Sequence, residues 1–195
     1  HGIFYQEDVD SYSNNKNYHV QDELGTSVLL PLFPPYKPDD CSLLYMTIAN
    51  CYQCYPFSKD ESKQLWKDIG RAHSDIRRLF PDSVLLADGR VLFVNGTHPT
   101  DSDFATKPSG VYDDQVAKYI DYGELEGEIY DPILKTWETI DKQKIPRGYH
   151  SFAILLYDGS VLVGGSHRYF ASKALKETES PWLNRELSLE VYYPD

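Results

Sequence analysis

The chain has 195 residues, and its 19 basic and 30 acidic residues give a formal net charge of −11. A chain this acidic repels phosphate, which excludes nucleic-acid binding as a first hypothesis. Its length favours one domain, its 41% apolar residues suffice for a buried core, and no apolar run approaches the ~18 residues of a membrane-spanning helix.

The N-terminal segment, residues 1–23, is polar and rich in Asn, Tyr and Asp. We predict a loop there, with residues 3–5 as a candidate edge strand. The first four residues, HGIF, contain neither an initiator Met nor the start of an apolar leader. We therefore interpret them as the interior of a longer chain or as a processed end.

Two apolar runs follow, GTSVLLPL at 25–32 and CSLLYMTI at 41–48, separated by a loop rich in Pro and Asp. Apolar runs joined by such a loop are typical of an antiparallel strand pair. Residues 58–80 are charged, with Trp66 and Ile69 as the main apolar side chains. That pattern predicts either a short helix or an irregular outer strand.

The three cysteines, Cys41, Cys51 and Cys54, are too few for a disulfide scaffold. The spacing Cys51-x-x-Cys54 is a weak metal signal, because tetrahedral zinc needs two more soft ligands and no second such pair occurs. One disulfide with a free thiol, or three free thiols, remain open. The sequence Asn95-Gly96-Thr97 permits N-glycosylation only in a secreted chain.

An internal repeat is the most informative feature of the sequence. Residues 83–97 read SVLLADGRVLFVNGT, and residues 153–167 read AILLYDGSVLVGGSH, at a constant offset of 70. Asp-Gly between two β-prone runs predicts a two-residue hairpin, so we interpret Asp88 and Asp158 as turn residues and not as catalytic carboxylates. The residues that we expect in buried strands are Leu85, Val91, Leu155 and Val161.

A second element accompanies the hairpins: EIYDP at 128–132, followed by Trp137, and EVYYP at 190–194. Four strand-like runs with a Trp and a closing pair of small residues are typical of a kelch blade, whose period is ~50 residues. The predicted fold is therefore all-β, an incomplete kelch-type β-propeller of about three four-stranded antiparallel blades over residues 24–195. A generic β-sandwich of hairpins is the alternative.

The repeat is longer than a kelch period, and we assign the excess to residues 100–127. This stretch holds seven acidic residues and two lysines. Burying that charge without partners is costly, so we predict an exposed and weakly ordered insertion.

Three stretches resemble the glyoxal oxidase and galactose oxidase family, and they occur in the family's order. They are GTSVLLPL at 25–32, PDSVLLADGRVLFVNG at 81–96, and IPRGYHS at 145–151 followed by LLYDGSVLVGGS at 155–166. The two stretches that contain Asp-Gly are specific to the family, and the stretch at 25–32 is supporting evidence only.

The resemblance implies a secreted copper radical oxidase built on a seven-bladed propeller. Such enzymes oxidise a small aldehyde or primary alcohol and reduce O2 to H2O2. Copper accepts one electron, and a tyrosyl radical cross-linked to a cysteine accepts the other. The family's Tyr-His pair matches Tyr149, which would be an axial phenolate ligand and the proton acceptor from substrate, and His150, which would be an equatorial imidazole ligand.

The chemistry of this pair places a condition on the backbone. Cu(II) favours nitrogen and oxygen donors, but consecutive residues of a strand point to opposite faces. Both side chains can reach one ion only at a strand entry, a position that suits Pro146 and Gly148. The alternative is that Tyr149 packs within the blade and His150 hydrogen-bonds to neighbouring backbone.

The sequence departs from the family in several places. The family's second histidine ligand lies in a C-terminal β-sandwich domain after the propeller, and its cross-linked Cys and Tyr lie in blades before the strand matched at 25–32. The Cys-Gly-Gly that closes the matched blade is replaced by residues 45–48. Seven blades need ~350 residues, so blades and the C-terminal domain are missing here. Neither Cys41, Cys51 nor Cys54 matches the cofactor cysteine.

Two functions follow from these observations. In the first, the chain is a fragment of a glyoxal oxidase-like copper radical oxidase and is inactive alone. In the second, it is a non-catalytic binding or structural module derived from a propeller. The remaining histidines show no common spacing, and we predict them on the surface or in loops: His19, His73, His98 and His167.

Overall fold

The computed structural model describes 103 of the 195 residues, in segments separated by gaps.

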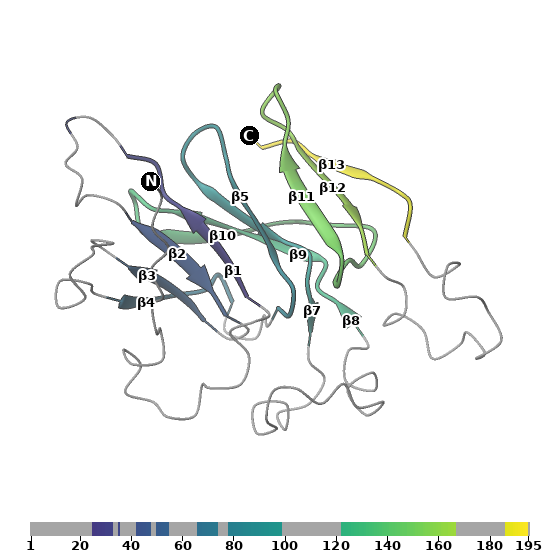
Figure 1. Ribbon diagram of the computed structural model, residues 1–195, viewed down its shortest axis with the longest axis horizontal. Helices are drawn as coiled ribbons and strands as arrows, with labels where there is room; N and C mark the ends of the chain where they lie inside the picture. The colour runs from purple at the N-terminus through teal and green to yellow at the C-terminus, as the bar shows by residue number, and fades with distance from the viewer. Residues whose placement is uncertain are drawn as a thin grey trace, which may run out of the picture.

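 These segments are residues 25–32, 35, 42–47, 50–54, 66–73, 78–98, 122–166 and 186–194. They form β-strands and turns, which confirms the all-β prediction, and the strands make three antiparallel sheets and one two-stranded ribbon (Figure 1). Within these segments, no helix has the length and apolarity needed to cross a membrane.

The first sheet contains four strands in chain order, and the predicted antiparallel pair is its β1 and β2. Residues 58–80 were predicted as a helix or an outer strand, and the strand is confirmed, because β4 lies at the outer edge. The predicted edge strand at 3–5 lies outside the described residues. The bounds are β1 (Thr26–Leu29), β2 (Leu43–Met46), β3 (Cys51–Cys54) and β4 (Trp66–Gly70).

The middle sheet has the order β10-β9-β6-β5, and the third sheet has the order β11-β12-β13. The short strands β7 and β8 pair with each other between β6 and β9. The bounds are β5 (Asp82–Leu85), β6 (Val91–Val94), β7 (Thr97–His98), β8 (Tyr122–Gly123), β9 (Glu126–Asp131), β10 (Thr136–Lys142), β11 (Ser151–Leu155), β12 (Val161–Gly165) and β13 (Glu190–Tyr192).

The three sheets are arranged as propeller blades. Their first strands are neighbours, because β1 contacts β5 and β5 contacts β11, while the later strands of each sheet extend outward (Figure 1). The first two blades have four described strands each, as predicted, and the third has three.

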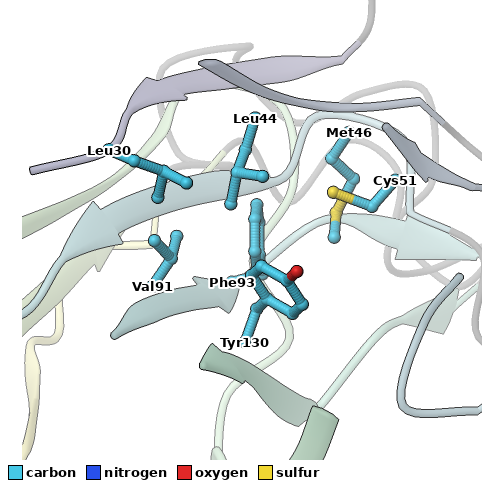
Figure 2. Close-up of a cluster of buried hydrophobic side chains, with 7 residues drawn as sticks. All are labelled: Leu30, Leu44, Met46, Cys51, Val91, Phe93 and Tyr130. Atoms are coloured by element: carbon cyan, nitrogen blue, oxygen red, sulfur yellow. The ribbon is translucent and has the colours of Figure 1, made fainter. Parts of the chain in front are cut away.

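Two apolar layers hold the blades together. Between the first and middle sheets lies a cluster that includes Leu44, Met46, Phe93 and Tyr130 (Figure 2). Between the middle and third sheets lies a second cluster, which includes Leu92. Burial of each such side chain contributes about 1.5–3 kcal/mol, so the middle sheet is stabilised from both faces. The remaining fully enclosed members of the two layers are Leu30, Cys51, Val84, Leu86, Val91, Val94, Ile129, Val161 and Val163.

The 70-residue repeat is also a repeat of backbone conformation. Residues with positive φ occur in four pairs at this offset, and two of these pairs lie at the ends of the second hairpin strands, β6 and β12. Both Asp-Gly sequences lie in hairpin turns as predicted, but the prediction of two-residue loops is wrong. The backbone N–H of Leu86 donates to Arg90 and that of Leu156 to Ser160, which leaves three-residue loops in which the glycine has positive φ and the aspartate does not. Asp88 and Asp158 each accept a hydrogen bond from the backbone N–H two residues later. The pairs are Phe80 (57°) and His150 (64°), Gly89 (90°) and Gly159 (87°), Asn95 (59°) and Gly165 (70°), and Gly96 (95°) and Ser166 (111°).

The structure corrects two predictions of burial and order. Val91 and Val161 are buried as predicted and Leu85 is partly buried, but Leu155, the last residue of β11 before the hairpin, is 37% exposed. The predicted insertion at 100–127 also extends too far. Its last residues form β8 and the start of β9, where Gly127 is buried against β10, and residues 99–121 lie outside the described segments.

Candidate functional site

The predicted Tyr-His pair lies in the turn that enters β11, the first strand of the third blade. His150 has a left-handed φ of 64°, and the N–H of Ser151 donates to the carbonyl of Gly148 at 2.8 Å. The rings of Tyr149 and His150 stack, with their centroids 3.8 Å apart and an interplanar angle of 26°. The turn thus brings both rings together before the pleat of β11 begins, which is the strand entry that the sequence required.

Phe80 supports the tyrosine from the neighbouring blade. Its ring meets Tyr149 edge-on, with the centroids 5.2 Å apart, and it enters β5 as His150 enters β11. Tyr149 is half-buried and His150 is exposed. The packing alternative for Tyr149 therefore has a structural basis too, because its ring contacts both an aromatic neighbour and the imidazole.

The backbone of this turn is held by the ends of two other strands. Gly148 donates its N–H to the hydroxyl of Ser166 at 3.0 Å, and a Cβ at Gly148 would lie 2.4 Å from the methyl carbon of Thr97. The N–H of Ser166 donates to the carbonyl of His150 at 3.3 Å. These contacts leave little room for any residue but glycine at 148 and fix the direction in which the two rings leave the backbone.

A partly buried carboxylate joins the two blades beside the turn. Asp82 accepts hydrogen bonds from the hydroxyl of Ser151 at 2.7 Å and from the side-chain amide of Asn95 at 2.8 Å. Burial raises the pKa of Asp82, and these two hydrogen bonds oppose the rise. Sequence reasoning missed this group. It noted Asn95 only as a glycosylation site, whereas the side chain is fully buried and engaged in the folded chain.

Buried ion pairs join β9 to the segment after β4 and to the segment before β5. Glu128 accepts from Arg71 at 2.5 Å and from Arg78 at 3.0 Å, and all three side chains are at most 2% exposed. Burial alone would raise the pKa of Glu128, but hydrogen bonds and charge from Arg71 and Arg78 hold it below the ordinary range. Arg78 also donates to the carbonyl of Asn95 at 2.8 Å.

The third blade repeats this pair. Arg147 donates to Glu190 at 3.3 Å and to the carbonyl of Gly165 at 2.9 Å, just as Arg78 contacts Glu128 and Asn95. Asn95 and Gly165 differ by the repeat offset, so the two arginines donate to equivalent carbonyls, although they themselves lie 69 and not 70 residues apart. The arginine of the motif IPRGYHS is therefore a structural residue that ties the entry turn to β13.

The side chains present fit a copper ion in kind, because a phenol oxygen and an imidazole nitrogen are donors that Cu(II) favours. Among the described residues, no group of three or more His, Cys, Asp and Glu side chains gathers where a metal could bind. Cys51 and Cys54 are buried residues of the first sheet, and burial raises the pKa of the Cys51 thiol well above its ordinary range.

Of the other histidines, His73 is a surface residue as predicted, with 61% of its side chain exposed. The side chains of the remaining ones lie outside the described part of the structure, and so does Cys41: His19, His98 and His167.

Comparisons with known proteins confirm the family resemblance. The chain is 31% identical over 114 residues to the aldehyde oxidase GLOX1 of Arabidopsis thaliana and 29% identical over 118 residues to the aldehyde oxidase GLOX of Vitis pseudoreticulata. These matches span 58% and 60% of the chain but only 16% and 20% of the two relatives. No family model matches the chain.

A solved structure shows the same fold. A fungal alcohol oxidase of the AA5 family, determined in complex with copper, superposes with a TM-score of 0.56 at 15% identity, over 88% of this chain and 31% of the oxidase. The fold is thus that of propeller blades in such an oxidase. The chain spans less than a third of each of these proteins.

Proposed function

We propose that this chain is a propeller part of a secreted copper radical oxidase of the glyoxal oxidase type, in which Tyr149 and His150 are two of the copper ligands. The observation that carries the proposal is the stacking of the two rings at the entry of β11, within the motif that resembles the family. The likeness to two aldehyde oxidases supports the same assignment.

The overall reaction would take two electrons from a small aldehyde or primary alcohol. A hydrated aldehyde, RCH(OH)2, gives RCOOH, two protons and two electrons, and O2 takes up both electrons and both protons to form H2O2. Copper, when bound, would supply one of the two one-electron acceptors. The second acceptor in the family is a tyrosine cross-linked to cysteine, to which no described residue of this chain is matched.

The role of Tyr149 would be to take the hydroxyl proton of the substrate at its phenol oxygen. The ring contacts with Phe80 and His150 would hold the phenol in one orientation for that transfer. His150 would contribute one imidazole nitrogen. Because His150 is exposed, its ring would be accessible to the copper ion.

We expect the 195-residue chain alone to be inactive. Tetragonal Cu(II) takes about four donors, and only Tyr149 and His150 are matched. The test is elemental analysis for copper after dialysis, combined with an assay of H2O2 production from methylglyoxal. Copper-dependent H2O2 production by this chain alone would contradict the ligand assignment.

A longer chain that restores the flanking blades and the C-terminal domain should be active. In that protein, Tyr149→Phe should lower kcat by about 10²–10⁴-fold, the range of a general acid–base residue. The matched control is Tyr157→Phe, because Tyr157 is fully exposed at the tip of the β11–β12 hairpin and should leave kcat unchanged. An equal loss in both variants would refute the role of Tyr149.

A non-catalytic binding or structural module is the second candidate. The observation that favours it is the packing of Tyr149 between Phe80 and His150, which also serves blade cohesion. The longer protein separates the two candidates, since a module would neither retain copper nor produce H2O2.

A further inference from the structure

Both ends of the turn that contains the Tyr-His pair are bound to the middle blade. Before the pair, the N–H of Gly96 donates to the carbonyl of Arg147 at 2.7 Å. After the pair, the hydroxyl of Ser151 donates to Asp82 at 2.7 Å. The turn leads into β11 of the third blade, but the groups that hold it follow β6 and begin β5. The position of the pair therefore depends on the middle blade.

A single carboxylate oxygen makes the second of these connections. Oδ2 of Asp82 accepts from the hydroxyl of Ser151 and also from the side-chain amide of Asn95, the latter at 2.8 Å. The side chain of Asn95 is fully buried, and its Oδ1 accepts from Gln143 at 2.9 Å. Rotation of this amide would break a buried hydrogen bond, which is costly. Asp82 is thus fixed from its own blade while it holds the residue that follows His150.

The contact between the first strands of two neighbouring blades, which we call a joint, has a different polar group in the other place where it is described. The strands β1 (TSVL) and β5 (DSVL) have the same sequence except at the first residue. Thr26 therefore stands in the first blade where Asp82 stands in the middle one, and its hydroxyl shares a hydrogen bond of 2.9 Å with that of Ser83. Two hydroxyls suffice for one joint, and a carboxylate occurs at the joint beside the Tyr-His pair.

The carboxylate provides a restraint that a hydroxyl does not. Burying a charge is costly unless hydrogen bonds compensate, but hydrogen bonds to an ionised group are shorter and stronger than those between neutral groups. Ser151 directly follows His150, and its N–H closes the turn on the carbonyl of Gly148. A restraint on Ser151 therefore restrains the direction in which the two rings leave the backbone.

We propose that Asp82 is a positioning residue for Tyr149 and His150, which acts through Ser151 and fixes the two stacked rings relative to the middle blade. The consequence of this role for catalysis rests on the proposed function. The orientation of the rings does not, because it can be measured in the chain without copper.

The test is the NMR spectrum of the 195-residue chain without copper, at one fixed pH, in which the ring protons of His150 report its stacking on Tyr149. His150→Gln assigns these resonances, and Tyr149→Leu gives the part of their chemical shift that the aromatic ring causes. We expect Asp82→Ala and Ser151→Ala each to abolish most of that part. Asp82→Asn and Ser151→Thr should retain it, because an amide oxygen can take the place of Oδ2 and threonine keeps the hydroxyl.

The matched control is Thr26→Val. It removes a half-buried hydroxyl from the other joint and should leave the His150 resonances where they are. Far-UV circular dichroism verifies that each variant is folded, and Ser151→Ala tests the same hydrogen bond if Asp82→Ala does not fold. Unchanged His150 resonances in a folded Ser151→Ala overturn the proposal, as does an equal change in Thr26→Val.

Activity separates this proposal from the proposed function. In the longer protein with the flanking blades and the C-terminal domain, Ser151→Ala should lower kcat about 10–100-fold, the usual effect of losing a group that orients a metal ligand. Ser151→Thr should restore it. If the wild-type longer protein retains no copper and makes no H2O2, the proposed function fails and the NMR spectra alone decide the role of Asp82. If the longer protein is active and Ser151→Ala leaves kcat unchanged, the proposed function stands and the positioning role is overturned.

Discussion

The middle and third blades share one backbone plan but differ in the residue that enters the first strand. Phe80 and His150 occupy equivalent positions with φ values of 57° and 64°, and the phenylalanine packs against the tyrosine that precedes the histidine. The repeated backbone fixes where a side chain leaves the strand entry. Under the proposed function, the residue at that position would determine whether the entry only packs, as Phe80 does, or also offers a metal donor.

The two blades also differ in how completely their buried ion pairs are enclosed. Glu128 has two arginine partners and no exposed side-chain surface, whereas Glu190 has Arg147 and is 20% exposed. Because a buried charge without its partner is costly, the same substitution should have unequal effects in the two blades.

The largest effect should come from Glu128→Gln. Loss of this carboxylate leaves Arg71 and Arg78 buried near each other, and we expect the free energy of unfolding to fall by about 3–5 kcal/mol. Glu190→Gln is the matched variant in the third blade and should cost about 1–2 kcal/mol, since water reaches that pair. Urea denaturation monitored by tryptophan fluorescence measures both. Equal losses would show that the two pairs are energetically equivalent.

Acid should act in opposite directions on two carboxylates, the buried Glu128 and the partly buried Asp82. The folded-state pKa of Glu128 lies below its ordinary value of 4.5, so the stability it contributes is complete above that value and is lost as the pH falls through the folded pKa. The folded-state pKa of Asp82 is raised above its ordinary value of 3.8, so its contribution is complete below 3.8 and is lost as the pH rises through the folded pKa.

The measurement is the change in unfolding free energy between pH 7 and pH 3. Glu128→Gln should lose less stability than the wild type over this interval, and Asp82→Asn should lose more. Parallel curves for the wild type and both variants would show that neither carboxylate titrates differently in the folded and unfolded chain.

Local sequence patterns predicted much of this fold. The Asp-Gly pairs predicted the two hairpins and the positive φ of Gly89 and Gly159, although the aspartates do not share that conformation. The apolar runs around them predicted the strand pairs. The prediction that Leu155 is buried was wrong, because the burial of a strand residue depends on how the neighbouring sheet packs on it. The local sequence pattern does not encode that packing.

The site was harder to predict than the fold. Tyr149 and His150 came from the family resemblance, while spacing alone required only that they lie at a strand entry. The Arg78–Glu128 and Arg147–Glu190 pairs join residues 50 and 43 positions apart. Such separations carry no periodic signal, although the repeated E-x-Y-x-P element marked both acidic partners.

The smallest difference that sharpens the comparison is the one between two glycine variants, at the exit of β12 and in the hairpin before it. Gly165 has a φ of +70°, and a Cβ there would lie 2.6 Å from the carbonyl oxygen of His150, so an alanine must displace the strand entry as well as adopt a left-handed backbone. We expect Gly165→Ala to lower the free energy of unfolding by about 2–3 kcal/mol. The control is Gly159→Ala in the hairpin, where φ is +87° but no atom lies within 4 Å of the added carbon, and backbone strain alone should cost about 1–2 kcal/mol. Because Asn95 adopts the same left-handed conformation at the equivalent position of the middle blade, strain at this exit is tolerable by itself. The extra loss of unfolding free energy in Gly165→Ala therefore measures the close approach to His150. Identical losses in the two variants would mean that the turn with Tyr149 and His150 shifts to accommodate the added carbon without loss of stability.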